Sequence, residues 1–247
     1  MASILKALPM IRISLGNVGS GKTASEVREL FFDRSKRMTY TNIETSLKNC
    51  ITLKPEMIII KKPVGKKIIY DVNVEFWKNA KKPINVVIDE AHNIIDSRNS
   101  MSRLNRAVTA WQSAIRRVLG ESEGDYGELV YITQLLDSVD VRTRDLCTQF
   151  RYHICHYMKT CEKCSYIWKE NSEMPEKRKS CQYCGNFQLK KSNFTIEILR
   201  FSSQDEFNAW KIDRQKTYYA RYYVSDIEKY FNLYDTLQWT NLFSSYQ

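Results

Sequence analysis

Short apolar runs alternate along the first 160 residues with segments whose apolar positions recur every three to four residues. Runs of this length are typical of strands that are buried on both faces of a parallel sheet. Four are expected to be such strands: residues 10–15, 38–43, 84–88 and 128–133. Helical spacing is found at residues 24–33 and, most clearly, at residues 101–119. The alternation predicts an α/β fold with a right-handed, mainly parallel central sheet flanked by helices.

Weaker patterns predict the remaining elements. Further helices are expected at residues 45–50, 74–80, 137–148, 205–210 and 226–233. Residues 150–157 are expected to form another strand, and residues 187–201 alternate as antiparallel strands do. The segment KKPVGKK at residues 61–67 lies between two apolar runs, so it predicts an exposed hairpin with a basic tip.

A glycine-rich octapeptide, GNVGSGKT, separates the first strand from the first helix and fits G-x-x-x-x-G-K-[ST] without a mismatch. Its glycines permit the backbone angles that turn successive N–H groups inward, and the dipole of the following helix reinforces this anion site. Lys22 is expected to reach the β and γ phosphates of ATP, and the Thr23 hydroxyl to ligate Mg²⁺. The residues expected to bind the nucleotide are Gly16, Asn17, Val18, Gly19, Ser20, Gly21, Lys22 and Thr23.

The apolar run INVVI ends in two carboxylates, Asp89 and Glu90. Ligands of open α/β sheets bind at the carboxyl ends of the strands, so these side chains are expected beside the octapeptide. Asp89 is predicted to hold the magnesium shell, and Glu90 to polarise the attacking water as general base. Either motif alone would be unspecific, but together they predict a magnesium-dependent ATPase.

Further catalytic candidates lie downstream. Gln134 follows the strand ELVYIT and is expected to sense the γ phosphate or to position water, the alternative being a plain strand end. Arg142 and Arg144 are candidates for arginine fingers, which stabilise transition-state charge in cis or from a neighbouring subunit. Both could instead be surface ion-pair residues, and Arg116 and Arg117 compete for the same role.

The tetrad DEAH at residues 89–92 is also a motif of a large helicase superfamily. Those helicases need two motor domains in one chain, and no second set of motor motifs follows residue 135. A nuclease of the large-terminase kind would need a carboxylate cluster, which the short tail lacks. The sequence therefore disfavours both activities.

Four of the seven cysteines form two Cys-x-x-Cys pairs that are sixteen residues apart: Cys161, Cys164, Cys181 and Cys184. This spacing is typical of a four-thiolate zinc ribbon in a reducing compartment. Four thiolates fill the tetrahedron around Zn²⁺, so a structural rather than a catalytic site is expected. The lysines, Trp168 and Tyr183 between the pairs suit phosphate and base contacts, the alternative being a stabilising clip with a solvated basic rim.

Composition bounds the class of protein. The 38 Lys and Arg against 28 Asp and Glu give a formal net charge of +10, which favours a polyanion such as double-stranded DNA as partner. No stretch of about 18 apolar residues occurs, so no membrane insertion or secretory signal is expected. The expected location is the cytoplasm, that of the host if the chain is viral, or the virion.

Four stretches make the chain resemble the FtsK/HerA-type viral genome-packaging ATPases and the related Zot (zonular occludens toxin) domain family: GNVGSGKT, TNI, VVIDEAHN and ITQLLDSVDVRTR. The YDT at residues 234–236 is similar to the C-terminal end of that group. The resemblance implies a RecA-like P-loop NTPase core of the ASCE type, arranged as a homo-oligomeric ring that moves DNA through its centre. It also implies that Gln134 is the polar sensor and that Arg142 or Arg144 lies in the family's basic segment.

Two features depart from this group. Zot proteins of filamentous phages carry a transmembrane segment that is missing here, and the zinc ribbon is not general to the group. Three parts are expected: an ATPase core at residues 1–158, a zinc-ribbon insertion at 159–190, and C-terminal strands and helices at 191–247 that complete the core or pack on it.

The expected function is an ATP-hydrolysing motor that translocates or packages DNA, with capsid or portal proteins as further partners. The basic hairpin at Lys61–Lys67 or the ribbon is expected to touch the DNA. The alternative is a nucleotide-gated DNA-binding or assembly ATPase that does not translocate.

Overall fold

A nine-stranded sheet forms the centre of the computed structural model, which describes residues 10–33, 37–65, 67–93, 103–122 and 125–235. Six of its strands are parallel and lie in the order β10-β1-β9-β6-β2-β3. Their bounds are β1 Met10–Leu15, β2 Met38–Thr41, β3 Cys50–Thr52, β6 Ile84–Ile88, β9 Glu128–Ile132 and β10 Gln149–Cys161. The strand β9 thus separates the octapeptide strand β1 from the acidic-motif strand β6, which is the order of a RecA-like P-loop NTPase and confirms the predicted fold class.

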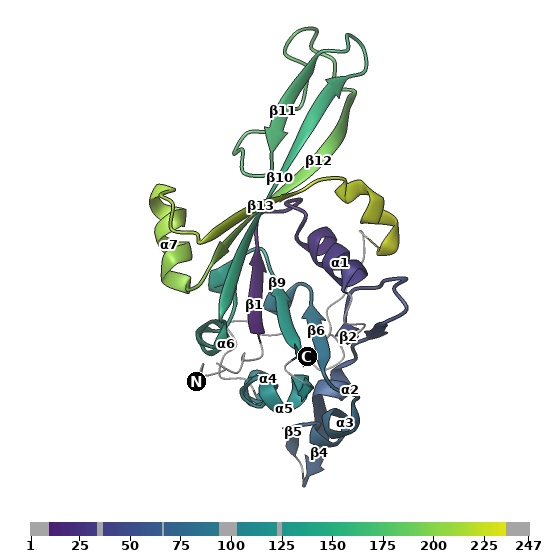
Figure 1. Cartoon of the computed structure of the whole chain (residues 1–247), viewed down its shortest axis with the longest axis vertical. Coiled ribbons are helices and arrows are strands. Elements are labelled where there is room, and N and C mark those ends of the chain that lie inside the picture. Colours follow the sequence, from purple (N-terminus) through teal and green to yellow (C-terminus); the bar gives the residue numbers. More distant parts are fainter. Residues whose placement is uncertain (1–9, 34–36, 66, 94–102, 123–124, 236–247) are drawn as a thin grey trace, which may run out of the picture.

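Antiparallel strands extend the sheet beyond β10. β12 (Leu189–Phe201) pairs with β10, β13 (Ala220–Val224) pairs with β12, and β11 (Ile167–Asn171) pairs with the outer half of β10. In Figure 1 the outer halves of β10 and β12 project from the core together with β11. This projection, residues 153–198, is called the arm below.

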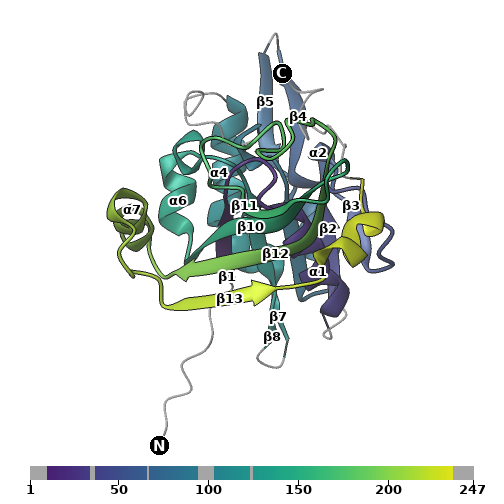
Figure 2. The same cartoon turned by 90° about the horizontal axis from the view of Figure 1, so that it is seen from above.

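Helices cover both faces of the parallel sheet (Figure 2). The core consists of hydrophobic clusters, and alternate residues of β9 belong to different ones. Leu129 and Tyr131 lie in the first cluster, and Val130 and Ile132 lie in the second. The second cluster is completed by α1, and the first by α3, α4, α5 and α7. The helix bounds are α1 Lys22–Phe32, α3 Val74–Asn79, α4 Arg103–Ser113, α5 Ile115–Leu119 and α7 Gln204–Asp213, and the 3-10 helix η4 (Ile227–Leu233) packs beside α1.

A buried ion network lies between α1 and the sheet. Arg12 of β1 contacts Glu26 and donates to Glu29 Oε2 at 2.9 Å, both on α1. Ser14 Oγ donates to Glu26 Oε1 at 2.6 Å, and Arg151 of β10 donates to Glu29 Oε1 at 2.6 Å. Burial opposes ionisation of Glu26, but Arg12 and Arg151 outweigh it and lower its pKa to about 2. The first helix is therefore held by charge as well as by apolar packing.

Strand β10 belongs to the core and to the arm at once. Its first four residues pair with β1, from Arg12↔Gln149 to Leu15↔Tyr152. Its pairing with β12 then continues from Phe150↔Phe201 to Cys161↔Leu189, with one irregularity between His156 and Met158. The strand runs without interruption across the expected boundary at residue 158.

The basic hairpin forms as predicted, with β4 (Ile59–Val64) and β5 (Lys67–Val72) paired in register from Ile59↔Val72 to Val64↔Lys67. A four-residue helix, α2 (Pro55–Ile58), precedes it. Gly65 at the turn has a φ of 59°, which glycine adopts without strain. A second small ladder joins β7 (Glu121–Ser122) to β8 (Asp125–Tyr126).

Three predicted helices differ from those observed. The helix expected at residues 45–50 is wrong, because the Thr45 and Ser46 hydroxyls bond to the carbonyl of Leu233 and Thr45 forms a bridge with Tyr234. Residues 101 and 102 of the helix expected at 101–119 lie outside the described residues. The rest divides into α4 and α5, where the amide of Ala114 bonds to the carbonyls of both Ala110 and Trp111.

The helix expected at residues 137–148 is shorter than predicted. Only α6 (Val141–Leu146) is α-helical, after the 3-10 turn η3 (Leu136–Ser138). Val139 ends the turn, and Asp140 caps α6, since its side chain accepts from the Arg142 amide at 2.9 Å. In the described part of the chain, no helix is long and apolar enough to cross a membrane.

Candidate nucleotide-binding site and metal centre

The octapeptide forms a closed loop between β1 and α1. Lys22 Nζ donates to the carbonyls of Gly16 at 2.8 Å and Asn17 at 3.1 Å, so its ammonium lies inside the loop. Gly16 has a φ of 148°, and a Cβ there would lie 2.6 Å from the carbonyl oxygen of His153. Burial lowers the pKa of Lys22, although Asp89 and Glu90 oppose the shift. The Lys22 ammonium inside this loop is placed to bind a phosphate group.

The acidic motif meets the octapeptide at the carboxyl edge of the sheet. Thr23 Oγ1 donates to Asp89 Oδ2 at 2.8 Å, and the Glu90 amide donates to Asp89 Oδ1 at 2.8 Å. Burial raises the pKa of Asp89, and the Thr23 hydrogen bond partly offsets this. A hydroxyl and a carboxylate oxygen this close are a donor set that Mg²⁺ accepts, with its remaining positions left to water and phosphate.

Glu90 lies in a strained backbone position just beyond β6. Its φ of 50° is left-handed, which a non-glycine side chain rarely adopts. Its Oε2 accepts no hydrogen bond from the residues described, and His92 Nδ1 lies 3.3 Å away. His92 belongs to the 3-10 turn η1 (Ala91–Asn93), and its Nδ1 lies 3.4 Å from Thr133 Oγ1. That oxygen is buried, but the Glu90 side chain as a whole is 41% exposed, so part of the carboxylate is open to a water molecule.

A cavity of about 270 Å³ joins these elements. Its lining includes Gln134, from the end of β9, so the structure brings this candidate to the same space as Lys22, Thr23, Asp89 and Glu90. The loop residues Val18, Gly19 and Gly21 line it as well. Ser20 lies buried behind the cavity, and Val18 is 70% exposed at its rim.

Five cavity residues were not identified from the sequence as part of the site: Ala24, Asn42, Ile43, Tyr234 and Asp235. Asn42, just after β2, donates to the Asp89 carbonyl at 2.9 Å and accepts from the Asp89 amide at 2.7 Å, so it fixes the backbone of the acidic motif. Tyr234 follows η4, and burial raises its pKa to about 12. The available signal for Asn42 was a polar residue at the end of a predicted strand; Tyr234 had none beyond the YDT resemblance.

The candidate arginine fingers lie apart from this cavity. Arg142 is exposed at the start of α6, and Arg144 Nη1 lies 3.6 Å from Asp137 Oδ1. Arg117 is exposed on α5, whereas the side chain of Arg116 lies outside what the structure describes. Since none of these lines the cavity, contact with a nucleotide of the same chain is not supported by the geometry.

The four ribbon cysteines converge at the tip of the arm. Their sulfur atoms all lie within 4.8 Å of one another. The distances from Cys161 to Cys184 and from Cys164 to Cys181 are both 3.6 Å. Thiolates bound at 2.3 Å around one tetrahedral Zn²⁺ would be about 3.8 Å apart, so the arrangement fits that ion. The amides of Ser165 and Gly185 close the two knuckles by bonding to the carbonyls of Cys161 and Cys181 at 2.9 Å.

The base of the arm contacts the octapeptide directly. Asn17 Nδ2 donates to Glu173 Oε1 at 2.9 Å and to the Ser172 carbonyl at 3.3 Å. Glu173 also accepts from the Tyr152 hydroxyl at 2.7 Å and pairs with Arg214 at 3.3 Å. The segment that follows β11 is thus linked to the phosphate loop and to the end of α7.

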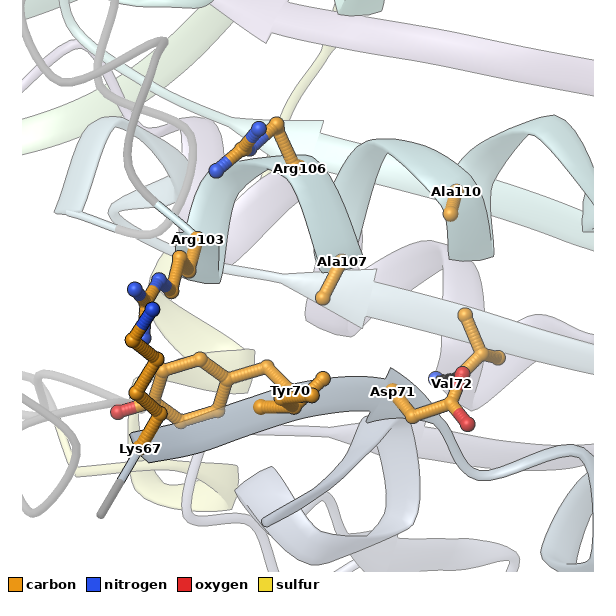
Figure 3. Close-up of a pocket in the computed structure, with 9 residues that line it drawn as sticks. Lys67, Tyr70, Asp71, Val72, Arg103, Arg106, Ala107 and Ala110 are labelled. Carbon is orange, nitrogen blue, oxygen red and sulfur yellow. Dashed lines mark hydrogen bonds between the residues drawn. The ribbon is translucent and has the colours of Figure 1, made fainter. Parts of the chain in front are cut away.

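A second, basic surface lies between the hairpin and α4. Figure 3 shows Lys67 and Arg103 at the same end of a groove of about 450 Å³, with Arg106 further along the helix. Arg103 Nη1 donates to the carbonyl of Ile68 at 3.0 Å, which ties the helix to the hairpin. All three cations are exposed.

Comparisons with known proteins give matches of structure only. No protein-family model matches the chain, and no curated protein sequence matches it. The N-terminal domain of zonular occludens toxin from Neisseria meningitidis is similar at 17% identity and a TM-score of 0.48, over 93% of this chain and 100% of that one. The genome packaging NTPase B204 from Sulfolobus turreted icosahedral virus 2, in complex with AMPPCP, matches at 13% identity and a TM-score of 0.35, over 58% and 75% of the two chains.

The DNA-packaging ATPase B204 from Sulfolobus Turreted Icosahedral Virus matches at 15% identity and a TM-score of 0.34, over 59% of this chain and 76% of that one. The similar structures thus include a zonular occludens toxin domain and viral genome packaging ATPases. The chain has a P-loop NTPase fold, on the strand order and the phosphate loop of its own structure.

Proposed function

We propose that this protein is a magnesium-dependent ATPase that uses hydrolysis to move double-stranded DNA, as in the packaging of a viral or mobile-element genome. The observation that carries the proposal is the convergence of Lys22, Thr23, Asp89 and Glu90 on one cavity. An ammonium in the phosphate loop, a hydroxyl beside a carboxylate, and a second, partly exposed carboxylate are the groups that phosphoryl transfer to water needs.

Each group has a role that follows from its chemistry. Lys22 binds the β and γ phosphates, and Thr23 and Asp89 hold the Mg²⁺ that neutralises phosphate charge when it is bound. Glu90 orients the attacking water, because it lines the cavity and its side chain is 41% exposed. Gln134 lines the same cavity and contacts the γ phosphate or that water.

Support for DNA as the substrate comes from charge. The groove between β5 and α4 carries Lys67, Arg103 and Arg106, and the chain as a whole has a formal net charge of +10. Cations that replace condensed counterions favour binding to a duplex without regard to its sequence. Sequence-independent contact is what a translocating enzyme needs.

A ring of identical subunits would give the arginines a use. Arg142 and Arg144 lie outside the cavity of their own chain, so they serve as fingers at the nucleotide of a neighbour. Capsid or portal proteins would be partners of such a ring, and the host cytoplasm or the virion its location.

The test measures ATP hydrolysis at low salt by the zinc-loaded full chain, with and without duplex DNA. We expect duplex DNA to raise the rate, and Glu90→Gln to lower kcat by about 100-fold or more while ATP stays bound. Glu56→Gln, an exposed glutamate remote from the cavity, is the matched control. A rate that ignores DNA, together with a Glu90→Gln variant that fails to retain ATP, would contradict the proposal.

One contact favours a second candidate function, a nucleotide-gated DNA-binding or assembly ATPase that does not translocate. Asn17 of the phosphate loop bonds to Glu173 at the base of the arm, so a phosphate that reshapes the loop changes this contact. Displacement of a triplex strand from duplex DNA during hydrolysis supports the motor. Nucleotide-dependent binding without displacement supports the gated factor.

A further inference from the structure

Three aromatic rings form a stack on the arm. Trp168 and Tyr166 have ring centroids 5.8 Å apart with an interplanar angle of 28°, and Tyr166 and Tyr183 follow at 6.3 Å and 15°. Trp168 belongs to β11, and Tyr166 is the residue just before that strand. Tyr183 comes from the second zinc knuckle. The knuckle held by Cys181 and Cys184 therefore completes the stack.

The stack ends at an open ring. Tyr183 is 80% exposed although one of its faces lies against Tyr166. An aromatic side chain so exposed contributes little to the stability of its own chain, because hydrophobic stabilisation scales with the area removed from water. The free face of Tyr183 continues the stacking direction into solvent, where a further planar group can add to it.

Polar contacts fix the orientation of the inner rings. Trp168 Nε1 donates to Glu170 Oε1 at 2.8 Å, and the Tyr166 hydroxyl accepts from Gln182. Beside these rings lies a groove of about 510 Å³, whose other wall includes Met174, Pro175 and Arg178. The stack is thus preorganised, and its rings need no rearrangement before they bind a ligand.

The charge on this part of the arm favours a polyanion as the occupant. Between residues 161 and 191 seven exposed side chains are basic and two are acidic. The exposed basic residues are Lys163, Lys169, Lys177, Arg178, Lys179, Lys190 and Lys191. The exposed acidic residues are Glu162 and Glu176. The less exposed Glu170 and Glu173 are paired with Lys159 and Arg214 respectively. A zinc tetrathiolate adds negative charge at the buried centre, so the basic side chains act at the rim.

We propose that the aromatic stack on the zinc-ribbon arm binds single-stranded nucleic acid, with an unpaired base on the free face of Tyr183 and the neighbouring lysines and arginine on the phosphates. Unpaired bases present both faces for stacking, whereas bases inside a duplex already stack on each other. This site lies on the arm, outside the nucleotide cavity, and it does not depend on DNA translocation.

The experiment measures binding of a fluorescein-labelled 20-nucleotide oligothymidine to the zinc-loaded full chain without ATP, by fluorescence anisotropy. We expect Tyr183→Ala to raise Kd by about fivefold or more, since one base–aromatic contact is removed. Tyr183→Phe keeps the ring and is expected to bind within about twofold of the parent. Tyr223→Ala removes an exposed tyrosine from β13, outside the stack, and is expected to leave Kd unchanged.

Three results would overturn the proposal. The first is an unchanged Kd for Tyr183→Ala at full zinc content; the second is an equal loss in Tyr183→Phe, which would make the hydroxyl the binding group. The third is an equal loss for a duplex of the same length, which would make the contact one with phosphate alone. Because this measurement involves no hydrolysis, a chain without DNA-stimulated ATPase activity could still show the Tyr183 effect, and the two proposals fail separately.

Discussion

The nucleotide cavity and the arm tip are built in opposite ways. The cavity is lined by five segments that are distant in sequence, from the phosphate loop to Tyr234, and each is held by the packed sheet. The zinc cluster draws on two short knuckles only, Cys161–Cys164 and Cys181–Cys184, and its surroundings are largely exposed. The core thus owes its site to packing, whereas the cysteine cluster of the arm is arranged so that it could hold a metal ion. A change that destabilises the packed core should therefore leave the cysteine cluster intact, and loss of the cluster should leave the core intact.

The largest effect is expected from removal of zinc. Zinc-finger peptides gain about 10 kcal/mol or more from the metal, so a chelator or Cys184→Ser should unfold the tip of the arm. Amide exchange should rise at residues 159–190 while the core helices stay protected, and metal analysis should show one zinc lost per chain. Cys50→Ser, outside the cluster, is the control and should keep its zinc. Global unfolding of the core on chelation would contradict the comparison.

The opposite perturbation is made in the core. In Glu26→Gln, Arg12 stays buried but loses the negative charge of Glu26. This should lower the free energy of unfolding by about 3 kcal/mol in urea titrations. The zinc content should not change. The exposed pair Lys62–Asp71 provides the control, since Asp71→Asn should cost about 0.5 kcal/mol or less. A loss of zinc in Glu26→Gln would mean that core and arm are not independent.

The same glutamate predicts a pH dependence. The pKa of Glu26 is lowered from 4.5 to about 2 in the folded chain, so its charge stabilises the fold fully above about pH 4.5. That contribution is lost as the pH falls toward 2, because the unfolded chain then binds a proton more readily. The difference in stability between parent and Glu26→Gln should therefore shrink over this range. A difference that stays constant down to pH 2 would argue against an ionised Glu26.

The smallest effect is expected where the two regions meet. Glu173→Ala removes the acceptor that Asn17 shares with Tyr152 at the base of the arm, together with the ion partner of Arg214, and should cost about 1 kcal/mol. Binding of a non-hydrolysable ATP analogue should alter amide exchange at residues 171–174 in the parent but not in this variant. Glu176→Ala, an exposed residue on the same loop, should respond as the parent does. An equal response in both variants would show that this contact does not link the regions.

Sequence reasoning was most informative where the chemistry is local. The octapeptide, the Asp89–Glu90 pair and the cysteine knuckles are short motifs whose spacing already defines a backbone shape. Asn42 and Tyr234 reach the cavity only through tertiary packing, so no local pattern could identify their contacts. The helix expected at residues 45–50 failed for the same reason, because its hydroxyls bond to Leu233, almost 190 residues away.

The extent of β10 shows a related limit. Its alternation predicted a strand at residues 150–157, but pairing with β12 extends the strand to Cys161. Likewise β13 was not predicted, since its residues Ala220–Val224 gain strand structure by pairing with β12 at the sheet edge. Both depend on a partner strand that no single segment reveals.

The register of β10 with β12 also bears on how the chain folds. Phe150 and Phe201 are about 50 residues apart in sequence, and closing so long a loop is entropically costly. If the knuckles bind Zn²⁺ early, Cys161 and Leu189 would be brought together first, and pairing would then proceed from the tip toward the core. We expect Zn²⁺ to speed refolding by this zipping, measurable as a faster tryptophan-fluorescence phase when the metal is present from the start. The ribbon would then act as a nucleation site for the edge of the sheet on which the phosphate loop rests.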